Sequence, residues 1–167
     1  TGSGYQAAVL SRLGARVSTI EIVPELAARA AATLARYRFA NVEVRSGDGF
    51  AGWPERGPFD AIIVTAGAAA VPEPLMQQLK PGGRLVMPIG PSWPLEQIEV
   101  FTRGADGAIT VCSLGPAMFV PLTGRGEAPS GQRGLYDRSL PLCYGAPVTC
   151  ASAIARHCIV AGHPQMT

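Results

Sequence analysis

A glycine-rich turn at the start of the chain restricts the fold more than any other feature. Residues 1–7 read TGSGYQA, which places Gly2 and Gly4 in a G-x-G-x-x-A spacing directly before a helical pattern. Such glycines permit a tight turn and the close approach of a ligand, and a helix start offers unpaired N–H groups. The next expected strand ends at Glu21, whose carboxylate can accept hydrogen bonds from a ribose diol. Folds that bind NAD or S-adenosylmethionine (SAM) share these features, although a plain turn followed by a surface glutamate remains an alternative.

Strand patterns alternate with helix patterns after this turn. Pro24 to Tyr37 is the clearest helix, because proline suits its first turn and Ala, Leu and Arg favour helix. Phe59 to Val64 is a nearly continuous apolar run, typical of a strand that is covered on both faces. The alternation predicts a parallel sheet with right-handed crossovers, closed by an antiparallel pair. Helices are expected over 5–13, 24–37 and 72–79, strands over 16–21, 42–46, 59–64 and 84–89, and a hairpin over 97–103 and 108–114.

Composition and charge exclude several classes of protein. The 167 residues are 47% hydrophobic and 16% charged, which fits one domain with a buried core rather than a disordered chain. The net charge is +2, without a cationic cluster in the first 123 residues, so nucleic acid is not an expected partner. No apolar run reaches the roughly 18 residues of a membrane-spanning helix, and no signal peptide is readable. We therefore expect a cytoplasmic protein that does not bind membranes.

The last part of the chain differs from the first in composition and periodicity. Gly124 to Cys150 is rich in Gly and Pro and shows no periodicity, whereas Ala151 to Ala161 suits a short helix. The sequence thus predicts a domain over residues 1–123 and a loop-like or disordered extension over 124–167. No metal site is expected, because the potential ligands match no common zinc spacing: Cys143, Cys150, His157, Cys158 and His163.

A second acidic motif follows the next strand. In Ser46-Gly47-Asp48-Gly49, the carboxylate of Asp48 lies between two glycines at a strand end. Ligands in such sheets bind beyond the carboxyl ends of the strands, where Asp48 could accept a hydrogen bond from an adenine amino group. An Asx turn is the alternative, since aspartate beside glycine often bonds its own backbone.

In their order along the chain, these motifs resemble those of the protein-L-isoaspartate O-methyltransferases. The segments that carry the resemblance are TGSGYQAAVL, TIE, PELAARA, NVEVRSGDG, GWPE, FDAIIVTA, VPEPLMQQLKPGGRLVMPIG and FVPL, and they span Thr1 to Thr123. The glycine loop, the acidic strand end and LKPGG are general to SAM methyltransferases, whereas GDG with GWPE and the final FVPL are more particular. The resemblance implies a Rossmann-like α/β methyltransferase fold, with a mostly parallel sheet and a C-terminal antiparallel hairpin.

The resemblance also implies the site residues. Gly2, Ser3, Gly4 and Tyr5 would line the methionine end of SAM, Glu21 would hold the ribose hydroxyls, and Asp48 and Gly49 would hold the adenine. Thr1 and Thr123 complete the expected cofactor set. The peptide substrate would lie along the segment from Thr65 to Val71, and the expected substrate residues are Thr65, Ala66, Gly67, Ala68 and Val71.

The reaction implied by the resemblance is methyl transfer from SAM to the free carboxylate of an isoaspartyl or D-aspartyl residue in a damaged protein. The ester then closes to a succinimide, which reopens partly to aspartate and so repairs the protein. A carboxylate with a pKa of about 4 is already a nucleophile at neutral pH, so alignment and exclusion of water suffice. The alternatives are a SAM methyltransferase for another carboxylate or hydroxyl substrate, a non-catalytic cofactor-binding fragment and an NAD-dependent oxidoreductase. We expect a monomer.

One departure from the family concerns the sheet. Family members carry, before the glycine loop, a first strand and a Ser- or Thr-containing loop, and neither is present in this chain, which we therefore interpret as truncated. The catalytic hydroxyl consequently has no counterpart here. The missing strand should lie between the strands ending at Glu21 and Val64, and its absence would leave two open edges. Each buried unpaired backbone group costs about 1–3 kcal/mol, against a net stability of about 5–15 kcal/mol. The sequence thus predicts an unstable and inactive chain.

Overall fold

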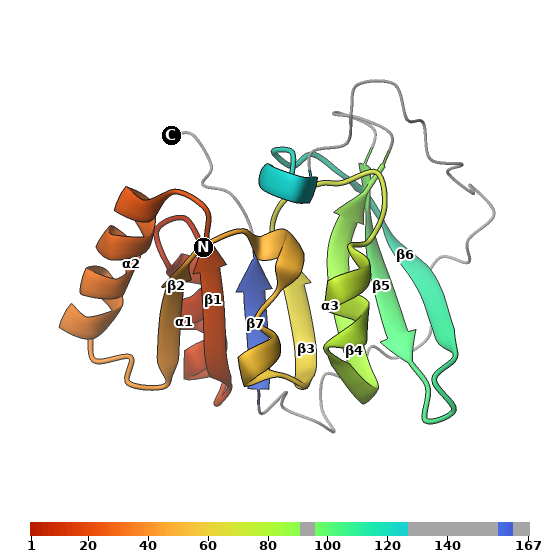
Figure 1. Cartoon of the computed structure of the whole chain (residues 1–167), viewed down its shortest axis with the longest axis horizontal. Helices are drawn as coiled ribbons and strands as arrows, with labels where there is room; N and C mark the ends of the chain where they lie inside the picture. The colour runs from red at the N-terminus through yellow and green to blue at the C-terminus, as the bar shows by residue number, and fades with distance from the viewer. Residues whose placement is uncertain (91–95, 127–156, 162–167) are drawn as a thin grey trace.

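The structure, a computed structural model, describes residues 1–90, 96–126 and 157–161. Its strands form one sheet in the order β2-β1-β7-β3-β4-β5-β6 (Figure 1). The first five strands in this order are parallel, and β5 and β6 add an antiparallel edge. The bounds are β1 (Arg16–Glu21), β2 (Val42–Ser46), β3 (Phe59–Val64), β4 (Leu79–Ile89), β5 (Glu96–Arg103), β6 (Ile109–Ala117) and β7 (His157–Ala161).

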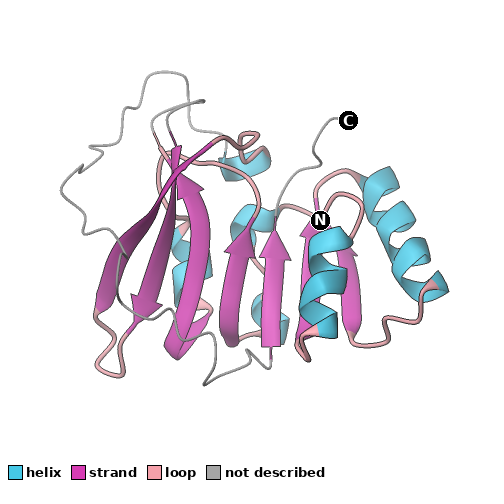
Figure 2. Ribbon diagram, turned by 180° about the vertical axis from the view of Figure 1, so that it is seen from behind, coloured by secondary structure: helices cyan, strands magenta, loops and turns pink. Residues whose placement is uncertain are grey.

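Helices cover both faces of the sheet. α1 lies over β1 and β7 on the face seen in Figure 2, while α3 lies on the opposite face, seen in Figure 1. α2 packs against β1 and β2, and it begins at Pro24 with Glu25 in its first turn, as the sequence predicts. The bounds are α1 (Tyr5–Arg12), α2 (Pro24–Arg36) and α3 (Glu73–Gln77), with 3₁₀ turns η1 (Gly49–Ala51), η2 (Pro54–Arg56) and η3 (Gly124–Gly126).

The segment between α3 and the core of β4 differs from its prediction. The sequence predicts a helix up to residue 79 and a strand from residue 84, but α3 already ends at Gln77 and β4 begins at Leu79. Leu79 pairs with Phe59, and the regular pairing with β3 resumes only at Arg84 with Ala61. The intervening residues therefore form an irregularity within the strand, where Gly82 adopts a positive φ of 79°.

The centre of the sheet is occupied by β7, which corrects three expectations. β7 lies between β1 and β3 and runs parallel to both, with Val17 and Ala61 each opposite Cys158. The expected gap is therefore filled. Residues 157–161 form a strand of the sheet, instead of the end of a helix and instead of part of a loop-like or disordered extension. The 3₁₀ turn over residues 124–126 is compatible with the loop-like character expected there. The rest of both predictions, over residues 127–156 and 162–167, lies outside the described residues.

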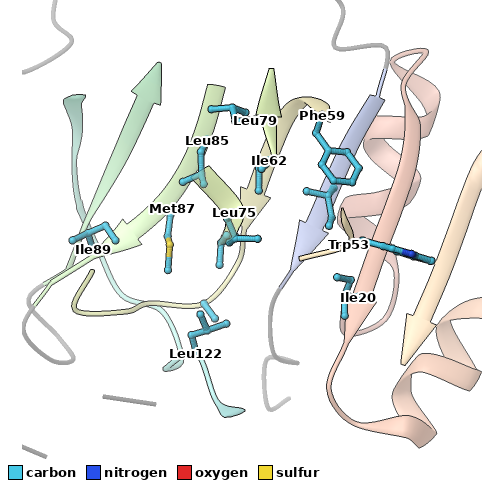
Figure 3. Close-up of a cluster of buried hydrophobic side chains, with 13 residues drawn as sticks. Ile20, Trp53, Phe59, Ile62, Leu75, Leu79, Leu85, Met87, Ile89 and Leu122 are labelled. Carbon is cyan, nitrogen blue, oxygen red and sulfur yellow. The ribbon is translucent and has the colours of Figure 1, made fainter. Parts of the chain in front are cut away.

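The sheet separates two apolar clusters, and β7 contributes to both. Ile159 belongs to the larger cluster, with Ile62 and Phe59 (Figure 3). Cys158 and Val160 point to the other face, where they pack with residues of α1 and β1. The pairing of β7 with both neighbours satisfies the backbone groups that the sequence suggested would be open. The physical reason for predicting an unstable chain is therefore absent.

Truncating Ile159 tests the contribution of β7 to stability. Its side chain is 0% exposed, so Ile159→Ala should lower the free energy of unfolding by about 2–5 kcal/mol, through lost burial and a cavity. Ile109→Ala on the edge strand β6, where the side chain is 42% exposed, is the matched control and should cost less than about 1 kcal/mol. Urea unfolding followed by circular dichroism measures both, and equal losses would contradict a central β7.

The start of β7 carries a cluster of charged groups at the amino end of the parallel strands. The backbone N–H of His157 donates to Asp60 Oδ2 at 2.9 Å, and Lys80 Nζ lies 3.0 Å from Asp60 Oδ1. Burial lowers the pKa of His157, and the cations Arg16, Lys80 and Arg56 lower it further, while Asp60 acts in the opposite direction. The folded chain therefore favours the neutral imidazole.

This lowered pKa predicts a pH-dependent stability. Because the unfolded imidazole has a pKa of about 6.5 and the folded one a lower pKa, the folded state binds fewer protons than the unfolded state in the pH range around and between these two values. The free energy of unfolding should therefore fall as the pH drops from about 7.5 to about 5.5. His157→Gln, which cannot titrate, should flatten this dependence in urea titrations, and an unchanged slope would show that His157 does not cause it.

Candidate functional site

Most of the sequence-predicted site residues lie at one edge of the sheet. β1 ends at Glu21, which pairs with Ser46 at the end of β2, and β3 ends at Val64 opposite Ala161 of β7. The carboxyl ends of these parallel strands, the glycine loop and the N-terminus thus share the same edge (Figure 1). In open α/β sheets this edge is where ligands bind.

The glycine loop packs directly against α2. Gly2 and Gly4 have positive φ angles of 55° and 86°, and Gly4 caps the start of α1. A Cβ on Gly4 would lie 3.2 Å from Leu34 Cδ1, so Leu34 would have to give way by a few tenths of an ångström, and the positive φ itself disfavours a larger residue there. Ser3 is exposed, as is Tyr5 at 75%, so these two side chains are free to meet a ligand.

Glu21 joins the glycine loop to the end of β1. Its Oε2 accepts a hydrogen bond from the N–H of Gly2 at 2.8 Å and lies 3.2 Å from the amino nitrogen of Thr1. Its Oε1 accepts from the N–H of Val23 at 3.0 Å, just before α2. The side chain is 0% exposed. A ribose hydroxyl can therefore reach Glu21 only if residues 1–2 shift away from it.

Asp48 makes the Asx turn that the sequence offered as one of its two interpretations. Its Oδ1 accepts from the N–H of Phe50 at 2.9 Å, which is the Asx turn. Its Oδ2 faces another segment and accepts from the N–H of Arg125 at 2.9 Å. The N–H of Gly47 donates to the carbonyl of Glu21 at 2.9 Å, so the two acidic residues are held by connected loops.

Residues 123–125 lie beside the second acid. A Cβ on Gly124 would lie 2.7 Å from Asp48 Oδ2 and 2.9 Å from Ile22 Cδ1. Thr123, the half-buried residue just before Gly124, is thereby brought to the edge that carries Asp48. Gly49 is buried in the same loop as Asp48 and begins η1.

The segment expected to border the substrate is held by backbone hydrogen bonds on three sides. The N–H of Thr65 donates to the carbonyl of Ala161 in β7 at 2.8 Å. Gly67 donates to Val120 at 2.8 Å, and Ala68 donates to Pro88 of β4 at 3.2 Å. Ala66 is buried and Val71 packs against the larger apolar cluster. The hydrogen bonds of this segment therefore fix its position against β7, β4 and the chain around residue 120.

Sequence reasoning missed Gln78, which fixes the loop after Asp48. Its Nε2 donates to the carbonyl of Ala51 at 2.8 Å, and its Oε1 accepts from the N–H of Trp53 at 2.7 Å. A Cβ on Gly52, which has a φ of 66°, would clash with this amide. No local sequence pattern predicts this role for Gln78, because its partners Ala51 and Trp53 lie 27 and 25 residues earlier in the chain.

Comparison with known proteins identifies the family. A sequence model of the family described as protein-L-isoaspartate(D-aspartate) O-methyltransferase matches residues 1–127. The chain belongs to this family. Protein-L-isoaspartate O-methyltransferase 1 of Anaeromyxobacter sp. (strain Fw109-5) is 54% identical over 125 residues, which cover 74% of this chain and 59% of the relative. The corresponding enzyme 2 of Nitrosococcus oceani is 51% identical over 129 residues, covering 77% and 58%. The chain thus spans about three fifths of the length of these family members.

Solved structures agree with the fold. A protein-L-isoaspartate O-methyltransferase superposes with a TM-score of 0.69 at 32% identity, covering 75% of this chain and 40% of the other. A protein from Plasmodium falciparum, described as a putative protein-L-isoaspartate O-methyltransferase in complex with S-adenosyl-L-homocysteine, superposes with a TM-score of 0.56 at 20% identity, covering 72% of this chain and 71% of the other. The Rossmann-like fold with an antiparallel end is therefore confirmed. β7 lies outside the residues that the family match covers.

The described residues contain neither a group of metal-binding side chains nor a membrane-spanning helix. Within residues 1–90, 96–126 and 157–161, no group of three His, Cys, Asp or Glu side chains could hold a metal ion. Of the potential ligands named above, Cys143, Cys150 and His163 lie outside these ranges. In the same described part of the chain, no helix is long and apolar enough to cross a membrane.

Asp48→Asn tests the long-range hydrogen bond of Asp48. The amide retains one acceptor oxygen, so it can keep the bond from Phe50 or the bond from Arg125 but not both. The free energy of unfolding should therefore fall by about 0.5–1.5 kcal/mol, the net value of one hydrogen bond. Asp106 makes only the equivalent turn bond, from the N–H of Ala108 at 3.0 Å, among the side-chain bonds described for it. Asp106→Asn should therefore cost less than about 0.5 kcal/mol in the same urea titration. Equal effects would exclude a role for the Arg125 contact.

Proposed function

We propose that this chain carries the SAM-binding part of a protein-L-isoaspartate (D-aspartate) O-methyltransferase. The proposed reaction transfers a methyl group to the free carboxylate of an isoaspartyl residue in a damaged protein. The observation that supports it best is the joint placement of the glycine loop, Glu21 and Asp48 at one edge of the sheet, within the residues that the family match covers. A structural neighbour described as a putative protein-L-isoaspartate O-methyltransferase is in complex with S-adenosyl-L-homocysteine, the product of this cofactor.

The residues at this edge fit a cofactor that carries a nucleoside. Asp48 is half-buried, and its Oδ2 can accept a second hydrogen bond besides that from Arg125, which suits an adenine amino group. Glu21 can accept from ribose hydroxyls once residues 1–2 shift, and it then exchanges one set of donors for another. Gly2, Ser3, Gly4 and Tyr5 would face the methionine end. When bound, SAM supplies the activated methyl group.

For the substrate, the protein mainly supplies alignment. Thr65, Ala66, Gly67, Ala68 and Val71 would border the isoaspartyl peptide, and the backbone bonds of this segment keep it in place before binding. A carboxylate with a pKa of about 4 needs no general base at neutral pH. Holding its oxygen in line with the methyl group and excluding water therefore accounts for most of the required catalysis. A monomeric, cytoplasmic enzyme without a nucleic-acid partner remains our prediction.

Methyl transfer to an isoaspartyl peptide tests the proposal. The chain was expected to be inactive because of open sheet edges and a missing hydroxyl. β7 fills those edges, and the reaction needs alignment more than a hydroxyl. We therefore expect the chain to transfer labelled methyl groups from SAM to this peptide but not to the same peptide with normal aspartate. Glu21→Gln places an amide against the N–H groups of Gly2 and Val23, and it should weaken SAM binding in calorimetry by at least about tenfold, or 1.4 kcal/mol. Asp106→Asn, in the turn between β5 and β6, is the control and should bind SAM normally.

The other outcomes distinguish the alternatives. Binding of SAM without methyl transfer would favour a non-catalytic cofactor-binding fragment. Methylation of other carboxylates or hydroxyls, but not of the isoaspartyl peptide, would indicate a different methyltransferase. Binding of NAD instead of SAM would indicate an oxidoreductase. Thermal unfolding of each variant, measured in parallel, separates a loss of binding from a loss of fold.

A further inference from the structure

We propose that Glu96 is a positioning residue that holds the substrate-bordering segment 65–71 in place. The proposal rests on the function proposed for that segment and extends it, by assigning a role to a residue of β5 that neither the sequence motifs nor the reaction chemistry singled out. Glu96 acts through Gly67 and Phe119, so it supports the site without taking part in the chemistry.

The burial of Glu96 is the first observation. Its side chain is only 4% exposed, and in β5 it lies opposite Ala117 of β6. A buried carboxylate destabilises a protein unless hydrogen bonds compensate for its lost hydration. Glu96 has such a bond, because its Oε2 accepts from the N–H of Phe119 at 2.8 Å. This bond ties β5 to the start of residues 119–122.

The second observation is the fit between Glu96 and Gly67. A Cβ placed on Gly67 would collide with Oε1 of Glu96 and would lie 2.8 Å from its Cδ. Gly67 is not among the glycines with a positive φ, so its backbone conformation does not demand glycine. A side chain at residue 67 would therefore have to displace the carboxylate of Glu96, which the hydrogen bond from Phe119 holds in place.

The third observation is that the two contacts of Glu96 meet in one hydrogen-bonded frame. Gly67 donates to Val120 at 2.8 Å, and Leu122 donates to Gly67 at 2.7 Å, so residue 67 pairs with the segment around Pro121. Glu96 touches both sides of this pairing, at Gly67 and at Phe119. It thereby fixes the position of the segment 65–71 relative to β5.

This frame gives the segment a single position before a peptide binds. On the other side of residue 67, Ala68 pairs with Ile89 at the end of β4. A segment held on both sides loses little conformational entropy when a ligand orders it. Loss of the Glu96 contact should therefore weaken peptide binding more than it slows the chemical step or weakens SAM binding.

Four variants test the role: Glu96→Ala, Glu96→Gln, Gly67→Ala and the double variant Gly67→Ala/Glu96→Ala. Glu96→Ala should raise the KM for an isoaspartyl peptide by about tenfold and change kcat by less than about twofold, with the Kd for SAM unchanged. Glu96→Gln keeps an acceptor for Phe119 and should stay close to the unsubstituted chain. Gly67→Ala should also be impaired, and removing Glu96 as well should restore part of its function, because the added methyl group then has room.

Hydrogen exchange supplies a readout that does not depend on activity. The amides of Gly67 and Leu122 should exchange faster in Glu96→Ala than in the unsubstituted chain, because the frame opens more often. Glu99→Ala is the matched control: Glu99 is a second buried glutamate of β5, and it pairs with Met87 and Ser113 further along the strand. This control should leave the exchange of Gly67 and Leu122 unchanged.

Three outcomes would overturn the proposal: unchanged exchange at Gly67 and Leu122 in Glu96→Ala, strictly additive effects in the double variant, and a lower Tm without any change in KM. The proposed function fails separately, if the unsubstituted chain methylates no isoaspartyl peptide. In that case, exchange and the double-variant comparison of stability still decide whether Glu96 holds residues 65–71.

Discussion

The pairing of β7 between β1 and β3 is the interaction on which the rest of the molecule depends. β1 carries Glu21 at its end and β3 leads into the substrate-bordering segment, so the spacing between the two halves of the site is the width of one intervening strand. β7 also contacts the site directly. Val160 accepts from the hydroxyl of Thr19 at 3.1 Å, and Ala161 accepts from the N–H of Thr65 at 2.8 Å. A sheet without this strand would have no fixed relation between the expected cofactor and substrate residues.

Around this sheet, the candidate site is held by side chains that bond to backbone. Glu21 accepts hydrogen bonds from the backbone of Gly2 and Val23, and Gln78 bonds the backbone of the loop that follows Asp48. These contacts place loops whose own backbone would then meet the ligand. Such an arrangement suits a reaction in which the nucleophile is already ionised, because precise placement matters more than proton transfer. It also explains why the chemistry of the site is inconspicuous in the sequence.

The sequence was informative wherever the signal was local. The bounds of β1, β2 and β3 follow from β-branched and apolar runs, and the placement of Glu21 and Asp48 at strand ends follows from the parallel order of the strands. β7 could not be recognised in this way, because the four apolar residues after His157 suit a strand or a buried helix equally well, and its partners lie far away in the chain. The roles of Gln78 and Glu96 could not be predicted for the same reason. Each is an ordinary polar residue until the fold brings a distant glycine or amide against it.

The position of β7 in the chain also constrains how the protein can be made. Thr19 and Val160 are 141 residues apart, yet they are bonded at the centre of the sheet. On a ribosome, the glycine loop, β1 and β3 emerge long before residues 157–161, so the sheet cannot close until late in translation. Contacts of such high sequence separation slow folding, and the unpaired edges of nascent strands invite aggregation meanwhile. Newly synthesised chains should therefore depend on chaperones more than their modest size suggests.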